Sequence, residues 1–200
     1  MKHFDDIMQH LEETQRFREQ IHTESRRIIA DCSRIIIQIH QGQYKEAQDM
    51  LHNTKSSLIK LQDIATSRDI VTVEQEYTEA HTLYNIVNHD RVPLPEQIGV
   101  APEAYILGML DTIGELKRFM LNCIRNDNLD TAYHTFDTME TLYECLYPFA
   151  AYNTILKESK RKLDVCRITL ESSRAIVTEE RRRQHLISRM RAMGFEPTNS

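Results

Sequence analysis

The sequence lacks tryptophan, has only five glycines and five prolines, and contains no apolar run approaching the ~18 residues of a membrane-spanning helix. It also lacks a glycine-rich phosphate loop and a Gly-x-Ser-x-Gly motif, which argues against P-loop nucleotide hydrolases and α/β-hydrolases. The acidic, amphipathic start of the chain does not have the pattern of a signal peptide. We therefore expect a cytoplasmic protein that makes no use of a membrane.

The cysteines are scattered, with no Cys-x-x-Cys pair, which argues against a zinc site. Each lies in a helical pattern, so we predict buried free thiols in a reducing compartment. The four residues concerned are Cys32, Cys123, Cys145 and Cys166.

The formal net charge of −5 argues against nucleic-acid binding by the whole surface, so that any such contact must come from local basic patches. Apolar residues make up 40% of the chain and charged residues 28%, which is enough for a core with a well-solvated surface. From the length of 200 residues we predict a single helical domain over residues 1–194 and a flexible tail over 195–200.

Apolar residues recur at the helical period along almost the whole chain, which predicts an all-α fold. The expected helices cover residues 4–41, 43–66, 69–88, 103–125, 129–146 and 152–192. Three prolines and Gly99 mark residues 89–102 as a loop. We predict an elongated bundle of six or seven long antiparallel helices, with enough apolar surface to favour self-association.

Two acidic pairs are the most informative feature: Glu76 with Glu79, and Asp111 with Glu115. Spacings of three and four residues place each pair on one face of its helix. If the two faces pack together, the four carboxylates repel one another unless a hard cation such as Mg²⁺ (or Mn²⁺) neutralises them. The sequence therefore predicts four catalytic, metal-binding carboxylates of a phosphodiester- or phosphoanhydride-cleaving enzyme.

Acidic pairs of this spacing also occur by chance on solvated helix faces. The second pair is distinguished by two glycines inside its helix, Gly108 and Gly114, each of which costs about 1 kcal/mol relative to alanine. Their presence predicts that another part of the protein or a ligand approaches the backbone of this helix closely. The competing interpretation is that Asp111 and Glu115 form ion pairs with Lys117, Arg118 or another helix.

Four blocks of the chain resemble the translin family, and within it the type of translin-associated factor X. The longest covers residues 100–118 and contains Tyr-Ile-Leu-Gly followed by Asp-Thr-Ile-Gly-Glu-Leu-Lys-Arg. The others are Glu-Tyr-Thr-Glu-Ala at 76–80, Thr-Glu-Ser-Arg-Arg at 23–27 and Asn-Leu-Asp-Thr at 128–131. The resemblance extends over about residues 10–185, and the acidic blocks are its specific part.

The resemblance implies an all-α subunit that assembles into a hollow, barrel-like octamer and acts as a Mg²⁺-dependent endoribonuclease, mainly on single-stranded RNA. It implies that Glu76, Glu79 and Asp111 are metal ligands and that Glu115 is a fourth ligand or supports the others. The connection at 89–102 is short where eukaryotic members carry a long insertion, which is typical of an archaeal relative built from one kind of subunit.

Basic residues within or beside the family-like blocks are the candidates for holding the RNA backbone: Arg26, Arg27, Lys117 and Arg118. Two other functions stay open. One is a non-catalytic scaffold that binds single-stranded nucleic acid, as translin itself does without the acidic set. The other is an all-α nucleoside-triphosphate pyrophosphohydrolase, which also uses Glu-x-x-Glu and a second acidic helix. Cleavage of RNA, binding alone, or hydrolysis of free nucleotides distinguishes the three.

Overall fold

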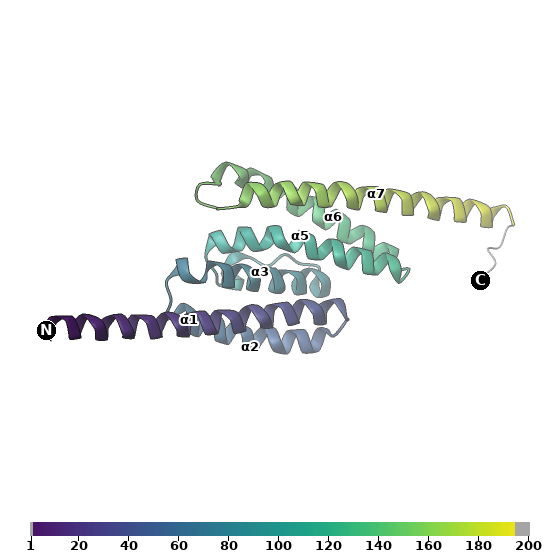
Figure 1. Cartoon of the computed structure of the whole chain (residues 1–200). Coiled ribbons are helices and arrows are strands. Elements are labelled where there is room, and N and C mark those ends of the chain that lie inside the picture. Colours follow the sequence, from purple (N-terminus) through teal and green to yellow (C-terminus); the bar gives the residue numbers. More distant parts are fainter. Residues whose placement is uncertain (1, 195–200) are drawn as a thin grey trace. The chain divides into compact units, whose positions relative to one another are not determined.

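A computed structural model describes residues 2–194, and within this range the chain contains helices and connections but no strand (Figure 1). The all-α prediction is therefore confirmed, while the predicted tail at 195–200 lies outside the described residues. The helices are α1 (Lys2–His40), α2 (Tyr44–Gln62), α3 (Ser67–His89), α4 (Pro95–Ile98), α5 (Pro102–Arg125), α6 (Leu129–Leu146), the 3₁₀ helix η1 (Tyr147–Tyr152) and α7 (Ser159–Ala192). None of these described helices combines the length and apolar character needed to cross a bilayer.

The helices divide into two compact units, with the boundary inside α5 between Thr112 and Ile113. In the first unit, α1, α2 and α3 pack on one another. In the second unit, α6 packs on α7, and η1 contacts both. Each unit therefore has its own set of packed helices, and the single domain over 1–194 stays a prediction.

The predicted helix ends near glycines and turn residues are confirmed. Gly42 follows α1 with a φ of +75°, and Gly194 follows α7 with a φ of +85°. Such left-handed backbone suits glycine, which has no Cβ to clash with the preceding turn. Asp127 adopts a φ of 56° between α5 and α6. Pro102 opens α5, where its missing N–H leaves no hydrogen bond unmade.

The core of the first unit includes fully buried residues of α1, α2 and α3, among them Ile28, Ile35, Leu58 and Leu83. Although the apolar period runs along the whole of α1, burial begins only at Ile21. The reason is length: α1 has 39 residues and α2 has 19, so the first half of α1 extends past α2 within this unit (Figure 1).

The core of the second unit is built from α5, α6 and α7. Its buried residues include Ile113, Leu116 and Met120 of α5 and Phe136 and Met139 of α6. On α7 the apolar residues at helical spacing, Leu163, Cys166 and Leu170, are also buried. This unit is therefore held by one apolar face on each of its three helices.

Several boundaries predicted from sequence are wrong. The last helix begins at Ser159, not near 152, because residues 147–152 form a 3₁₀ helix around Pro148 and Glu158 is left-handed, with a φ of 70°. Asn153 Oδ1 accepts a hydrogen bond from the Lys160 backbone N–H at 3.2 Å, which satisfies a first-turn donor of α7. The expected loop at 89–102 contains the short helix α4, and α2 ends at Gln62.

The cysteine prediction is correct in part. All four thiols are free, and three of them are buried. Cys145 is exposed, contrary to prediction, because its position on α6 points away from the face that carries the buried residues Phe136, Met139 and Leu146. Helical periodicity alone does not say how far round a helix its partners reach.

Candidate carboxylate site

Gly108 brings α5 against α3 within the first unit. A Cβ added to Gly108 would lie 2.5 Å from the backbone oxygen of Gln75 and 2.6 Å from Cβ of Thr78. No side chain fits at such distances, so the backbone of α5 touches α3 at this point. The predicted close approach is therefore confirmed for Gly108. It is wrong for Gly114, which is exposed, with no atom within 4 Å of the corresponding Cβ position.

Asp111 lies almost one turn beyond this contact and is tied to α3. The Gln75 side-chain amide donates a hydrogen bond from Nε2 to Asp111 Oδ2 at 2.6 Å. Both residues are half-buried. A short bond between an amide and a carboxylate fixes the rotamer of both side chains, and it holds one of the predicted acidic residues at the surface of the helix that carries two others.

Glu76 and Glu79 are half-buried on α3, beside the buried residues Tyr77, Thr78 and Ala80. The two glutamates therefore lie at the edge of the core. Both glutamates also lie near Cys32 of α1. Burial raises the pKa of the Cys32 thiol, and the negative charges of Glu76, Asp31 and Glu79 raise it further. Cys32 is completely buried. The packing of α1 on α3 thus creates a region of negative potential around Cys32.

Glu115 lies in the second unit, four residues after Asp111 on the same helix. It is half-buried and forms an ion pair with Arg118, with Oε2 and Nη1 3.6 Å apart. The local ion pair considered as the competing interpretation is therefore present for Glu115. Because Arg118 is exposed and the pair spans only three residues of one helix, it contributes little to stability.

The donor chemistry of these residues fits a hard divalent cation. Mg²⁺ and Mn²⁺ prefer carboxylate oxygens, and half-buried carboxylates keep room for the water and phosphate ligands that such ions retain. The side chains are not gathered for coordination, because residues 2–194 contain no group of three or more His, Cys, Asp or Glu positioned to hold a metal ion. The contact at Gly108 brings the helices together, and side-chain rotation would have to close the site.

Another acidic residue of α3, Glu74, has a structural role that the sequence did not reveal. Its side chain is buried, and it accepts hydrogen bonds from Gln62 Nε2 at 2.6 Å and from the Ala101 backbone N–H at 3.2 Å. Gln62 also donates to the Gly99 carbonyl at 3.0 Å, and the Lys55 ammonium donates to the Ile98 carbonyl. These bonds attach the segment before α5 to α2 and α3, and so fix where α5 begins.

The four basic residues predicted to hold RNA have different surroundings. Arg27 pairs with Glu24 at 2.7 Å and donates to Ser57 Oγ at 3.2 Å. Lys117 Nζ donates to Ser172 Oγ at 2.7 Å within the second unit, and Arg118 pairs with Glu115. Arg26 is exposed and lines a groove between α1 and the start of α3.

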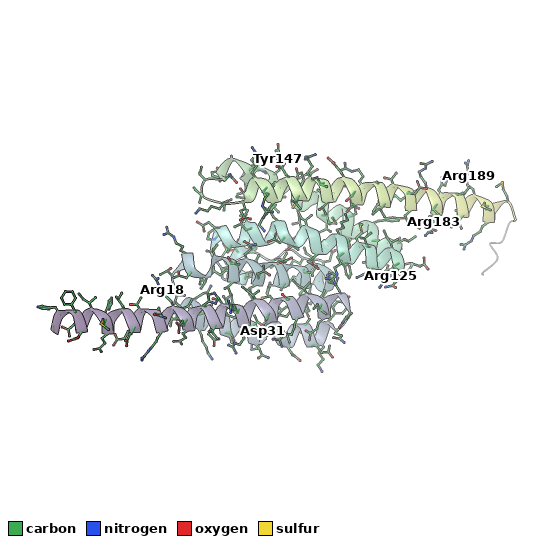
Figure 2. The ribbon with its side chains drawn as sticks, viewed as in Figure 1. Arg18, Asp31, Arg125, Tyr147, Arg183 and Arg189 are labelled. Carbon is green, nitrogen blue, oxygen red and sulfur yellow. The ribbon has the colours of Figure 1, made fainter. Side chains whose placement is uncertain are left out.

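The same groove is lined by Arg18 and His22, which the sequence analysis did not select. Figure 2 labels Arg18 on α1. The signal that could have found them is the spacing of four residues that relates Arg18, His22 and Arg26 along one helix face.

Residues 53–178 match the sequence profile of the translin family. The chain belongs to the translin family. The match includes Glu76, Glu79, Asp111 and Glu115 and leaves out the first 52 residues, which contain the basic residues of α1.

Among individual relatives of this translin-family chain, an uncharacterized protein of Methanocaldococcus jannaschii is 37% identical over 162 residues, which cover 78% of the chain and 72% of the relative. The solved structure of AfC3PO has a TM-score of 0.79 and 24% identity, and its complex with duplex RNA a TM-score of 0.77 and 24% identity; each comparison covers 90% of this chain and 96% of the other. Apo-NeC3PO has a TM-score of 0.74 and 20% identity, covering 89% and 97%. These solved structures share the fold of the chain.

Proposed function

We propose that this translin-family protein is a Mg²⁺-dependent endoribonuclease that cleaves RNA, preferentially single-stranded RNA, in the cytoplasm. The observation that carries the proposal is the contact at Gly108, which lets Gln75 of α3 hold Asp111 of α5 beside the helix that carries Glu76 and Glu79. Half-buried carboxylates on two helices in backbone contact are a suitable framework for a cation that binds phosphate.

In this proposal Glu76, Glu79 and Asp111 hold Mg²⁺ (or Mn²⁺), and Glu115 is a fourth ligand or orients the others. When bound, the cation would supply an activated water molecule and neutralise negative charge on the phosphate oxygens. The Gln75 amide keeps the Asp111 carboxylate in one orientation, as supporting hydrogen bonds do in metal sites generally. One of the glutamates accepts the proton of the attacking water.

RNA is the proposed ligand because AfC3PO, which shares the fold, has been solved in complex with duplex RNA. The resemblance of the acidic blocks to translin-associated factor X supports the choice of hydrolysis over binding alone. The preference for single strands is part of the proposal, and a comparison of matched single-stranded and duplex substrates tests it.

We further propose that the protein acts as a homo-oligomer, an octamer by resemblance to its family. Large apolar side chains are exposed on the first half of α1, where Phe4 is 72% and Met8 60% exposed, and on α7, where Leu186 is 59% exposed. Exposed apolar residues in such number are typical of surfaces that pack against other subunits. In this proposal a single kind of subunit is enough to build the assembly.

The decisive experiment measures cleavage of a labelled single-stranded RNA with Mg²⁺, with Mn²⁺ and with EDTA. We expect EDTA to abolish cleavage and Asp111→Asn to lower it by at least ~100-fold without loss of RNA binding, since Asn keeps an oxygen for Gln75 but loses the negative charge. Asp137→Asn, the same change at an exposed position of α6, is the matched control.

Full cleavage by Asp111→Asn would disprove the assignment of the site. RNA binding without cleavage by the unmodified protein would favour the non-catalytic scaffold. Hydrolysis of free nucleoside triphosphates with no action on RNA would favour the pyrophosphohydrolase.

A further inference from the structure

A pocket of about 310 Å³ lies between α2 and α3, with α4 beside it, entirely within the first unit. Among residues 2–194, no aspartate or glutamate lines it, and no residue of α1 does. The volume is at the lower end of the range of small-molecule pockets. The lining carries basic, amide and apolar side chains: Lys55, His52, His81 and His89; Gln48, Asn85 and Gln97; Leu51, Tyr77 and Tyr84.

The buried ring of Tyr77 brings two of the basic side chains to the same end of the pocket. The Lys55 ammonium of α2 lies 5.5 Å from the centroid of this ring, and the His81 imidazole of α3 lies 5.7 Å from it, centroid to centroid. Tyr77 is 2% exposed, so the packing of the core holds it in place. The cation and the imidazole are therefore positioned by one rigid group.

Lys55 has hydrogen-bond donors to spare. Its ammonium carries three protons, of which the Ile98 carbonyl accepts one. The side chain is half-buried and forms no ion pair within the described part of the chain. Burial lowers the pKa of Lys55, and the charge of Glu74 raises it. Both oxygens of Glu74 are already occupied, by Gln62 and by the Ala101 N–H, so Lys55 lacks a close anionic partner.

The hydrogen bonds of Asn85 determine the tautomer of His81. The Asn85 amide nitrogen donates to the His81 backbone carbonyl at 2.8 Å, and the same NH₂ group lies 3.2 Å from Nδ1 of the ring. Nδ1 therefore accepts, and we assign the ring proton to Nε2. Burial, and then the charges of Lys55 and Arg91, lower the pKa of His81 to about 4. The imidazole is thus neutral at pH 7 and offers one N–H, for which the described residues provide no acceptor.

The rest of the pocket is polar and less positive. Gln97 accepts the Leu94 N–H through Oε1 at 2.9 Å, which leaves its amide nitrogen as a donor. The exposed ring of His89 packs edge-on to Tyr84 at 5.6 Å. Burial raises the pKa of Tyr84, and the charge of Asp49 also raises it, so a carboxylate lies outside this end. A negative group is therefore favoured at the Lys55 end, and a polar, uncharged group here.

The histidines of this pocket are not arranged as metal ligands. His81 and His89 are eight residues apart on α3, a rise of about 12 Å. Within residues 2–194, no three His, Cys, Asp or Glu side chains are placed to share a metal ion. Lys55 would also repel a cation. The donors and the positive charge suit an anion instead.

We propose that this pocket binds a phosphate monoester with a polar body, the class of a sugar phosphate, with the phosphate between the Lys55 ammonium and the His81 Nε2–H. A phosphate group accepts several charge-assisted hydrogen bonds and supplies the negative charge that Lys55 lacks. The body extends toward Gln97 and Tyr84. This site goes beyond the proposed nuclease function and does not depend on it.

The test measures binding of ribose 5-phosphate to the full chain by isothermal titration calorimetry at pH 7. EDTA is present, so that no cation at the candidate carboxylates can hold the phosphate. Lys55→Met removes the ammonium and keeps an apolar chain on Tyr77, and it should weaken binding by about tenfold or more. Lys60→Met, the same change at an exposed position of α2 that does not line the pocket, is the matched control and should bind normally.

A second variant addresses folding, because Lys55→Met also leaves the Ile98 carbonyl without its donor. His81→Phe keeps a ring against Tyr77 and removes only the Nε2–H, so it should weaken binding by about tenfold while circular dichroism shows a folded protein. Affinity equal to that of Lys60→Met in the His81→Phe variant would overturn the proposal, whatever the fate of Lys55→Met.

Two further ligands test the chemical class. Ribose, which lacks the phosphate, should not bind measurably, and inorganic phosphate, which lacks the body, should bind at least about tenfold more weakly than ribose 5-phosphate. Equal binding of ribose and its phosphate would overturn the anion site. Equal binding of phosphate and ribose 5-phosphate would overturn the assignment of a monoester.

A nuclear magnetic resonance titration of the His81 ring locates the anion. A phosphate beside the imidazole stabilises its protonated form, so the pKa of His81 should rise above about 4 with ribose 5-phosphate and not with ribose. An unchanged pKa in the presence of saturating ligand would place the phosphate elsewhere and overturn the proposal. None of these measurements involves RNA cleavage, so this site and the proposed nuclease stand or fall separately.

Discussion

At the scale of single residues, the two glycines of α5 are the sharpest contrast in the molecule. They are six residues apart in one helix and look alike in the sequence. In the structure a Cβ at Gly108 would collide with the Gln75 carbonyl and with Thr78, whereas a Cβ at Gly114 would meet nothing within 4 Å. Gly108 is a packing requirement, and Gly114 is an exposed glycine in a helix.

Gly108→Ala should lower the free energy of unfolding by about 1–3 kcal/mol, because backbone atoms cannot yield to the added methyl group as a flexible side chain would. Gly114→Ala is the matched control and should be neutral or stabilising by up to about 1 kcal/mol, because alanine loses less backbone entropy in a helix. Urea denaturation of both variants, followed by circular dichroism, measures the difference. Equal stability of the two variants would contradict the close approach of α5 to α3.

At the scale of elements, α3 organises the candidate site. One face of this helix contacts α5, through Gln75 and Thr78 at Gly108 and through the Thr82 hydroxyl, 3.5 Å from the Met109 sulfur. An adjoining face carries Glu76 and Glu79 toward α1. Hydrogen bonds outside the Gly108 contact set the place of α5 along α3. Glu74 accepts one from the Ala101 backbone N–H, just before Pro102, and one from Gln62 of α2, which also donates to the Gly99 carbonyl.

Glu74→Gln should therefore destabilise the protein by about 1–3 kcal/mol, because the amide has only one oxygen for the two donors that the carboxylate now satisfies. Glu46→Gln, the same change at an exposed position of α2, should be close to neutral. Thermal denaturation compares the two. A second readout is amide hydrogen exchange, which should speed up at Ala101 in Glu74→Gln alone, and unchanged protection there would contradict the role given to Glu74.

At the scale of the whole molecule, the most informative property is the apolar surface that stays exposed to solvent. The first half of α1 exposes Phe4, Ile7, Met8 and Leu11 within the first unit, and α7 exposes Val165, Ile168 and Leu186 within the second. Such surfaces are unfavourable in water, and association that covers them is the physical basis for the proposed homo-oligomer.

Ile7→Glu combined with Leu11→Glu should produce smaller assemblies that stay helical, because the two residues are 55% and 59% exposed and contribute nothing to the core of the first unit. Gln15→Glu adds negative charge to the same half of α1 without removing apolar surface, and serves as the control. Light scattering after size-exclusion chromatography gives the mass. An unchanged mass for the double variant would exclude this half of α1 from the interface.

Local patterns in the chain were enough to predict the helices, most of their ends and the two acidic pairs, because the apolar period, the capping glycines and the i, i+3 spacing involve only neighbouring residues. Tertiary structure decided the rest, because packing depends on which helix covers which face. It chose Gly108 over Gly114 as the point of contact and gave Glu74 a supporting role. It also left Arg18 and Arg26 exposed beside a groove whose other wall, at Thr72 and Val73, lies more than forty residues away in sequence.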